Sequence, residues 1–313
     1  MGYTAPIGSD GRLSASERTT LLEPPGGDVE IVLDTDTYNE IDDQFAIVYA
    51  LLSESIDVQA VYAAPFVNQR SSGPADGMRK SYDEIIRLLD LLEYPGPSEI
   101  TYRGATEFMT DTGEPDENPA TEDLIRRVRK QEDGPLYVVA IGAPTNVSSA
   151  IERAPEIIEN MVVVWLGGHP LSWHTADEFN LRQDLHASRV LFDSGVPLVL
   201  VPCKNVAEHL RMTVPELEHH LSGQGELSDY LLEIFTEYRQ AEDRAVWSKE
   251  IWDLAPIAYL LEHDWIPTNV AHSPHLSTGL RYSRDTSRHL IRVAKDVRRD
   301  PVFDDFVRKL TTL

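Results

Sequence analysis

The sequence predicts an α/β fold with a mostly parallel open sheet flanked by helices and a helical elaboration toward the C-terminus. Short apolar segments of strand length alternate with longer segments that repeat apolar residues at helical spacing. The strand segments are apolar throughout, as expected of parallel strands that are buried on both faces. Alternation of strand and helix then implies βαβ units, and therefore helices on both sides of the sheet.

The first predicted strand is the apolar run Val29–Leu33, and a helix follows it from Asp42. Asp42 and Asp43 suit a helix start, because carboxylates accept backbone N–H groups there and favour the positive end of the helix dipole. Further apolar runs predict strands at 58–64, 136–141, 161–166 and 197–203. Helical spacing predicts helices that contain 78–89, cover 121–130, follow Thr145 and cover 187–194.

The last third of the chain has a different pattern. From about Val214 long helical segments predominate, and we predict helices at 215–221, 227–239 and 247–262. Two apolar runs, 276–282 and 289–297, are predicted to pair as a hairpin, and Asp300-Pro301 begins a terminal helix. Residues 1–27 are polar and rich in Gly, Ser, Thr and Pro, so we expect a flexible N-terminal arm before a single domain that covers 28–313.

Composition restricts the classes of function. The formal net charge of −24 at pH 7 argues against nucleic acid and anionic membranes as partners, since both need a basic surface. No apolar run approaches the roughly 20 residues that span a bilayer, and the N-terminus lacks the apolar core of a signal peptide. A cytoplasmic location is therefore expected. The single cysteine, Cys203, excludes an internal disulfide, and its apolar surroundings predict inert core.

Four aspartates and a glutamate stand in the ten residues 34–43. Asp34 and Asp36 lie at the end of the first strand, and Asp42 and Asp43 open the next helix. In an open α/β sheet that edge is where ligands bind. Carboxylates this close repel one another unless a cation neutralises them or a proton is shared. Capping explains Asp42 or Asp43 but not the strand-end pair, so the segment predicts a hard divalent cation with oxygen ligands.

Three later segments also carry chemistry. The turn Ala140–Asn146 can expose a backbone carbonyl to a cation. Glu178-Phe179-Asn180 offers an acceptor and an amide that suit sugar hydroxyls, and Trp252-Asp253 places an acid inside an apolar helical pattern, where a buried Asp needs a partner. Each segment has an ordinary alternative: a common βα turn, an irregular loop, and a solvated or capping aspartate.

Taken together, these segments resemble the inosine-uridine-preferring nucleoside hydrolases, which have a Rossmann-like fold. The resemblance spans about Val29 to Glu262 and rests on Asp34-Thr35-Asp36, on Asp42-Asp43, on a Gly-x-x-Thr-Asn turn at 142–146 and on Glu178-Phe179-Asn180. The loop between the two acidic pairs is longer than usual and looks like that of a divergent bacterial and archaeal branch. An Asn expected shortly before Glu178 is not evident, and Ser172 stands near its position.

The resemblance implies roles for particular residues. A single Ca²⁺ would be held by Asp36, Asp43, the backbone carbonyl of Thr145, and Asp253. Ribose hydroxyls would be bound by Asp42, Asn68, Glu178 and Asn180. Asp34 would support the ion's ligands without touching the ion. The implied partner is a small nucleoside, and we expect a homodimer or homotetramer.

The implied reaction is hydrolysis of the N-glycosidic bond of a ribonucleoside to free base and ribose. Water bound to Ca²⁺ would attack C1′ in an oxocarbenium-like transition state while Asp36 accepts its proton. Many members place a His before the last Asp ligand to protonate the base, whereas this chain has Trp252 there. An indole can stack on a purine and favour its protonated form, so the resemblance implies a catalytic Trp252 and a preference for purine nucleosides.

Two other functions fit parts of the sequence. A protein with the same scaffold could bind nucleoside or ribose with little turnover. A haloacid-dehalogenase-type phosphatase would share the Asp-x-Asp after the first strand and would use Mg²⁺. Against the phosphatase, Tyr38 stands where Thr or Val is expected, and Asp42-Asp43 follows too soon.

Overall fold

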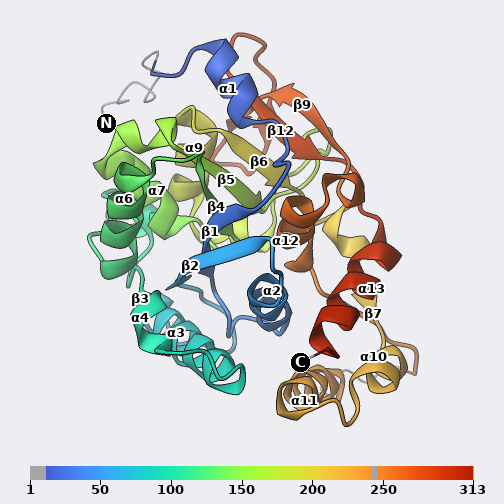
Figure 1. The fold of residues 1–313 in the computed structure, drawn as a ribbon. Coiled ribbons are helices and arrows are strands. Elements are labelled where there is room, and N and C mark those ends of the chain that lie inside the picture. Colours follow the sequence, from blue (N-terminus) through green and yellow to red (C-terminus); the bar gives the residue numbers. More distant parts are fainter. Residues whose placement is uncertain (1–11, 241–244, 313) are drawn as a thin grey trace.

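The protein is described by a computed structural model over residues 12–240 and 245–312. Side by side, the strands of the main sheet in this part of the chain are β3 (Thr101–Arg103), β2 (Ile56–Ala63), β1 (Val29–Thr35), β4 (Leu136–Ala140), β5 (Met161–Leu166), β6 (Leu198–Val201), β12 (Leu290–Ala294) and β9 (Thr268–His272). Neighbouring strands run parallel except β12 and β9 (Figure 1). The predicted mostly parallel sheet is confirmed.

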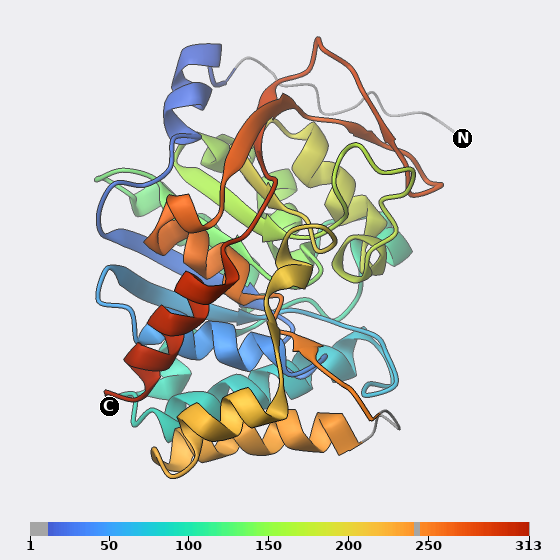
Figure 2. The ribbon, with the colours of Figure 1, turned by 90° about the vertical axis from the view of Figure 1, so that its right-hand side faces the viewer.

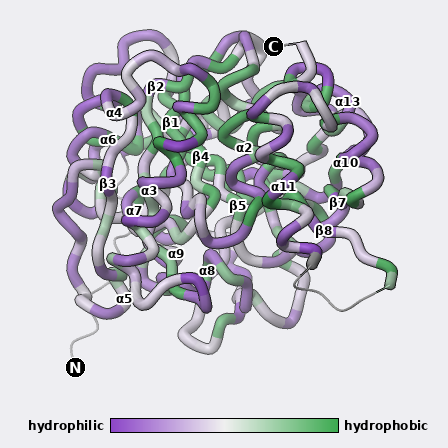
Figure 3. The backbone as a smooth tube through the Cα atoms, turned by 90° about the horizontal axis from the view of Figure 1, so that it is seen from below, coloured by the Kyte–Doolittle hydropathy of each residue, from purple (hydrophilic) through white to green (hydrophobic). Residues whose placement is uncertain are grey.

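Helices cover both faces of this sheet (Figure 1). One face carries α2 (Asp42–Leu51), α3 (Pro74–Leu91), α12 (Leu254–Leu261) and α13 (Arg299–Leu310), and the other carries α6 (Pro119–Lys130), α7 (Thr145–Arg153) and α9 (Leu185–Asp193). Successive strand residues point to opposite faces, so Leu33 joins the first apolar core and Val32 the second. Hydrophobic segments therefore gather in the middle of the molecule (Figure 3).

The helical elaboration lies on the C-terminal side of the chain. Helices α10 (Val214–Leu221) and α11 (Glu226–Gln240) pack against each other at the bottom of Figure 2, which confirms two of the three predicted long helices.

No helix in the described part of the chain combines the length and the apolar character that crossing a membrane requires. The remaining elements are short: α1 (Ala15–Leu21), α4 (Pro97–Ile100), α5 (Met109–Thr112), α8 (Phe179–Gln183), the 3-10 turns η1 (Pro155–Glu159), η2 (Ala207–His209) and η3 (His263–Trp265), and the strand pairs β7 (Arg211–Met212) with β8 (Lys249–Glu250) and β10 (His275–Leu276) with β11 (Tyr282–Ser283).

The third predicted long helix, 247–262, is wrong in its first half. β8 occupies 249–250, and α12 begins only at Leu254. Pro256 stands at the third helical position, where its missing N–H breaks no intrahelical bond. A helix extending further back would place this proline in its interior and lose a hydrogen bond. Trp252 and Asp253 consequently lie before the helix and not inside it.

The predicted hairpin is also wrong. β12 pairs with β9, while 276–282 folds back on itself as β10, a tight turn and β11. In that turn the Leu280 N–H donates to the Ser277 carbonyl at 3.0 Å. β9 is an edge strand whose residues are mostly exposed, so it lacks the apolar run by which the buried strands are found.

The predicted N-terminal arm contains a helix. The Ser14 hydroxyl accepts from the Glu17 N–H, and the Glu17 side chain accepts from the Ser14 N–H at 2.8 Å, which is a capping box. Arg18 donates to the Gly195 carbonyl, and the Leu22 carbonyl accepts from Arg292. Residues 14–22 are thus docked on the domain, and the expectation of a loose arm is wrong for them. Residues 1–11 lie outside the described residues.

The strand order creates a crevice beside β1. The chain moves from β1 outward to β2 and β3, then returns to place β4 on the other side of β1. Loops that leave β1 and β4 therefore diverge, and such a switch point is where open α/β sheets bind ligands. The Ile141 N–H donates to the Asp34 carbonyl at 2.8 Å, which joins the ends of the two strands.

Candidate active site

A cavity of about 290 Å³ opens at the C-terminal ends of the parallel strands. Its walls come from the segment after β1, the ends of β4, β5 and β6, the start of α8, and the segment before α12. The residues predicted for the site that line it are Asp42, Asp43, Glu178, Asn180, Trp252 and Asp253. Segments far apart in sequence therefore meet at the sheet edge where we expected them.

Three carboxylates converge in this cavity. Asp42, Asp43 and Asp253 each offer an oxygen, and these oxygens all lie within 4.8 Å of one another. Burial raises the pKa of Asp42 to about 6, and burial together with repulsion from Asp42 raises the pKa values of Asp43 and Asp253. Asp253 occupies the N-cap position of α12 but its side chain makes no capping bond, so the capping alternative does not explain it.

Asp36 is a fourth buried carboxylate near these three, although it is not among the residues that line the cavity. In the described part of the protein neither of its side-chain oxygens has a hydrogen-bond partner. Burial raises its pKa, and repulsion from Asp43 and Asp42 adds to the effect. A buried polar atom without a partner costs about 1–3 kcal/mol. A hard cation with oxygen ligands would satisfy Asp36 and relieve the repulsion, so the donor set fits Ca²⁺.

Side chains behind these acids fix their positions. The Thr35 hydroxyl donates to Asp43 Oδ1 at 2.6 Å. Asn146 donates from Nδ2 to Asp34 Oδ1 at 2.7 Å, while burial raises the pKa of Asp34 to about 7. Thr145 opens α7, and its hydroxyl donates to Asp184 Oδ2 at 2.9 Å. These contacts anchor the turn after β4, and the carbonyl of Thr145 as a cation ligand stays a prediction.

Glu178 and Asn180 also line the cavity. Glu178 is the N-cap of α8 and accepts backbone N–H groups from Gly168, Asn180 and Leu181 at 2.8–3.1 Å. Asn180 donates from Nδ2 to the carbonyls of Ile141 and Leu166, which ties together the ends of β4 and β5. Both residues are buried. Their architectural role explains why they stand here, and contact with ribose stays a prediction.

Asn68 is placed differently from the other predicted ribose contacts, because it is not among the residues that line the cavity. Its Nδ2 donates to Asn39 Oδ1 at 2.6 Å and to the Asn39 carbonyl at 3.1 Å. Asn39 does line the cavity. Asn68 therefore acts on the cavity through its hold on Asn39.

Trp252 separates the cavity from a second, more polar hollow of about 380 Å³. The ammonium of Lys204 lies 5.0 Å from the centre of its ring, and that of Lys249 lies 5.8 Å from it. Lys249 is buried and paired with Glu40. Although burial opposes its charge, Asp42 and Glu40 raise the pKa of Lys249. The indole is thus bracketed by two cations.

Three cavity residues, His169, Cys203 and Lys204, were not predicted as part of the site. His169 is 8 % exposed and its Nδ1 has no partner in the described part of the protein. Cys203, expected as inert core, is buried in the cavity wall; burial, followed by the charge of Glu178, raises the pKa of its thiol. Cys203 ends the predicted strand 197–203, Lys204 directly follows it, and His169 comes three residues after the predicted strand 161–166, so the rule that ligands bind at strand ends could have found them.

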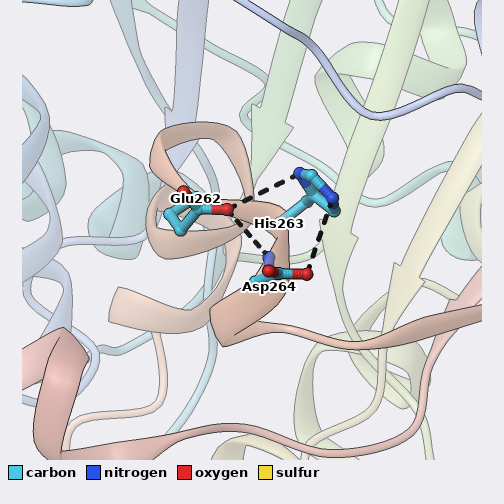
Figure 4. A group of neighbouring side chains, drawn as sticks. All are labelled: Glu262, His263 and Asp264. Atoms are coloured by element: carbon cyan, nitrogen blue, oxygen red, sulfur yellow. Dashed lines mark hydrogen bonds and ion pairs between the residues drawn. The ribbon is translucent and has the colours of Figure 1, made fainter.

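A second group of metal-ligand types lies on the surface. Glu262, His263 and Asp264 are consecutive, exposed, and in contact with one another (Figure 4). They are far less buried than the group at the strand ends. Exposed acids of this kind are common and are satisfied by water, so the buried group is the candidate metal centre.

Comparison with known proteins gives a consistent result. A family model described as inosine-uridine preferring nucleoside hydrolase matches residues 31–304. The pyrimidine-specific ribonucleoside hydrolase RihA of Citrobacter koseri is 26% identical over 255 residues, covering 72% of this chain and 78% of that protein.

Solved structures with the same fold belong to enzymes of that description. A plant nucleoside hydrolase has a TM-score of 0.72 at 21% identity, with 92% of this chain and 100% of that chain covered. The purine-preferring ribonucleoside hydrolase from Gardnerella vaginalis has a TM-score of 0.72 at 20% identity, with 90% of this chain and 98% of that chain covered. These likenesses establish the fold.

Proposed function

The chain belongs to the inosine-uridine preferring nucleoside hydrolase family, and we propose that it hydrolyses purine ribonucleosides with the help of Ca²⁺. The observation that carries this proposal is the set of buried carboxylates at and beside one cavity. Asp42, Asp43 and Asp253 converge, and Asp36 lies close enough to be repelled by two of them. The family match removes the phosphatase alternative.

The proposed ligands of Ca²⁺ are Asp36, Asp43, the Thr145 carbonyl, and Asp253. When bound, the ion supplies a charge that lowers the pKa of water and attracts ribose hydroxyls. Asp42 lies among the same oxygens, so it is well placed to accept hydrogen bonds from the ribose diol. Glu178 and Asn180, which line the same cavity, would hold the rest of the sugar, and Asn68 would position Asn39.

Asp36 is the proposed general base. Both of its oxygens lack a partner in the described protein, so one is free to accept the proton of the attacking water. Cleavage of the C1′–N bond builds positive charge on the ribose ring. Neighbouring carboxylates favour that charge, because opposite charges attract strongly in a buried site. A covalent intermediate is not required.

The proposed purine preference rests on Trp252. Its ring lines the cavity directly before Asp253, so a ribose held near Asp253 would present its base to the indole. Stacking on a flat aromatic ring favours the larger purine. The names of relatives point both ways, since RihA is pyrimidine-specific and the Gardnerella enzyme is purine-preferring. The proposed purine preference therefore rests on Trp252 of this chain and not on the names of its relatives.

A panel of purine and pyrimidine nucleosides, assayed for released reducing sugar with Ca²⁺ and with EDTA, tests the proposal. We expect cleavage of inosine and guanosine that EDTA abolishes and Ca²⁺ restores. Equal or faster cleavage of uridine would overturn the purine preference. Tight nucleoside binding without release of base in a single-turnover experiment would favour the alternative of a binding protein on the same scaffold.

A further inference from the structure

We infer that Lys204 donates a proton to the departing base, an inference that rests on the proposed function. Lys204 directly follows Cys203 at the end of β6, and it lines the same cavity as Trp252 and Asp253. Its ammonium lies 5.0 Å from the centre of the Trp252 ring. A base stacked on Trp252 would therefore lie beside a cationic N–H donor.

The chemistry of the leaving group requires such a donor. When the C1′–N bond breaks, both bonding electrons go to the base nitrogen. A purine released as an anion is a poor leaving group, and a positioned acid accelerates such steps by about 10²–10⁴-fold. The indole of Trp252 donates a hydrogen bond only weakly and does not give up its proton. A lysine ammonium beside the stacked base can supply the proton.

The other cationic side chains near the cavity are less suited to give a proton to the base. Arg182 is half-exposed and paired with Asp177 at 3.3 Å, and a guanidinium does not release its proton in proteins. Lys249 is buried against Glu40, and it lines the second hollow on the other side of Trp252. Lys204 is the lysine that shares the cavity with the proposed metal ligands.

Contacts outside the cavity hold Lys204 in place. Its ammonium pairs with Glu208 at 3.2 Å, and the Asn205 N–H donates to Glu208 at 2.5 Å. A lysine ammonium has three N–H donors, so the pair with Glu208 leaves donors for a substrate. This anchoring keeps a flexible side chain near the ring face, which reduces the entropy lost when a base binds.

Electrons and protons are conserved in the proposed reaction. The C1′–N bond breaks, its electron pair goes to the base, and a proton moves from Lys204 Nζ to a base nitrogen. Water forms the new C1′–O bond and gives its proton to Asp36. Lys204 is left as a neutral amine and regains a proton from solvent, while Asp36 returns its proton to solvent. One nucleoside and one water yield ribose and neutral base.

His169 is the rival donor. It also lines the cavity, and its Nδ1 has no partner in the described part of the chain. However, the centre of its ring lies 5.1 Å from the centre of the Trp173 ring, and the N–H of its neighbour Gly168 donates to the Glu178 carboxylate. These contacts hold His169 beside Glu178, which is proposed to bind the sugar. The Lys204–Trp252 contact favours Lys204 for the base.

Two substrates separate the possibilities. Inosine needs a proton on its leaving base, whereas p-nitrophenyl riboside releases a stable phenolate. Lys204→Met should reduce kcat/KM for inosine by about 10²–10⁴-fold and change p-nitrophenyl riboside less than about 3-fold. Lys204→Arg, which keeps the charge but not the transferable proton, should stay impaired on inosine. Lys130→Met, an exposed lysine on α6, is the matched control for loss of a positive charge and should equal wild type.

The outcomes are distinct. An equal loss on both substrates, or no loss on inosine, would overturn the role of Lys204, and a selective loss in His169→Gln with normal Lys204→Met would transfer that role to His169. Wild-type protein that cleaves neither substrate would overturn the proposed function and the inference together. Melting temperatures of all variants establish that each one folds.

Discussion

The carboxyl groups of Asp42 and Asp253 meet inside the protein, and an oxygen of one lies within 4.8 Å of an oxygen of the other. The two residues come from opposite ends of the domain, one opening α2 and the other preceding α12. Burial raises the pKa of both carboxyl groups, and the charge of Asp42 raises the pKa of Asp253 further. A divalent cation bound here would relieve the repulsion among these crowded carboxylates, because it supplies opposite charge.

Added Ca²⁺ should therefore stabilise the protein, and EDTA should reverse the effect. A ligand that binds only the folded state adds about 2.7 kcal/mol at a concentration 100 times its Kd, which corresponds to a rise of several degrees in Tm. Asp253→Asn should abolish this rise in a thermal melt. Asp264→Asn, in the exposed surface group, is the matched control and should keep it; a loss of the rise in the control would place the ion elsewhere.

Replacing the proposed general base should separate activity from stability. Asp36→Asn preserves shape and removes a buried charge, so the melting temperature should not fall. Loss of a general base typically reduces kcat by at least about 10²-fold. Steady-state kinetics with inosine at saturating Ca²⁺ measure this loss. Near-normal turnover would mean that another group accepts the proton of water.

The role of Trp252 can be tested by its dependence on the leaving group. Trp252→Ala should lose about 0.5–1.5 kcal/mol of aromatic stacking beyond simple burial. The loss in kcat/KM should be larger for inosine or guanosine than for p-nitrophenyl riboside, and Trp252→Phe should recover part of it. An equal decrease on all substrates would show that Trp252 only positions Asp253.

Acid should destabilise the protein through His289. Burial, followed by the charges of Arg18, Arg288 and His272, lowers its pKa to about 3 in the folded state. The unfolded chain takes up this proton below about pH 6.5, so the stabilising contribution is complete above that pH and is lost as pH falls toward 3. His289→Gln should flatten the fall in Tm between pH 6.5 and 4. Exposed His263→Gln is the control, and a flattened curve there would contradict the assignment.

Much of the site could be predicted because parallel strands end at one edge. The apolar strands can be recognised in the sequence, and their ends meet at one edge of the sheet. This is enough to predict that Asp36, Asp43 and Glu178 lie near one another. The position of Asp253 was harder, because a helical pattern with a proline near its start leaves the first helical residue undetermined. The structure resolves this by starting α12 at Leu254.

Other features depend on contacts that a single sequence does not encode locally. Asn68 reaches Asn39 and not the cavity, since its side chain direction is set by the loop that follows β2. The partner of β12 is β9, an exposed strand with no apolar signature. That Nδ1 of His169 has no hydrogen-bond partner among the described residues is recognisable only when the loops around it are in place.

Four helices begin at or beside the candidate site: α2 at Asp42, α7 at Thr145, α8 after Glu178 and α12 after Asp253. Each helix start carries a partial positive charge that is worth about 0.3–1 kcal/mol to a nearby anion. Because these helix starts converge, their partial positive charges offset part of the repulsion among the carboxylates. This effect comes from the backbone of the fold and not from the acidic side chains. Transplanting the same acidic residues onto an unrelated framework, with the spacing of their oxygens preserved, should therefore yield a weaker ion site than this domain provides.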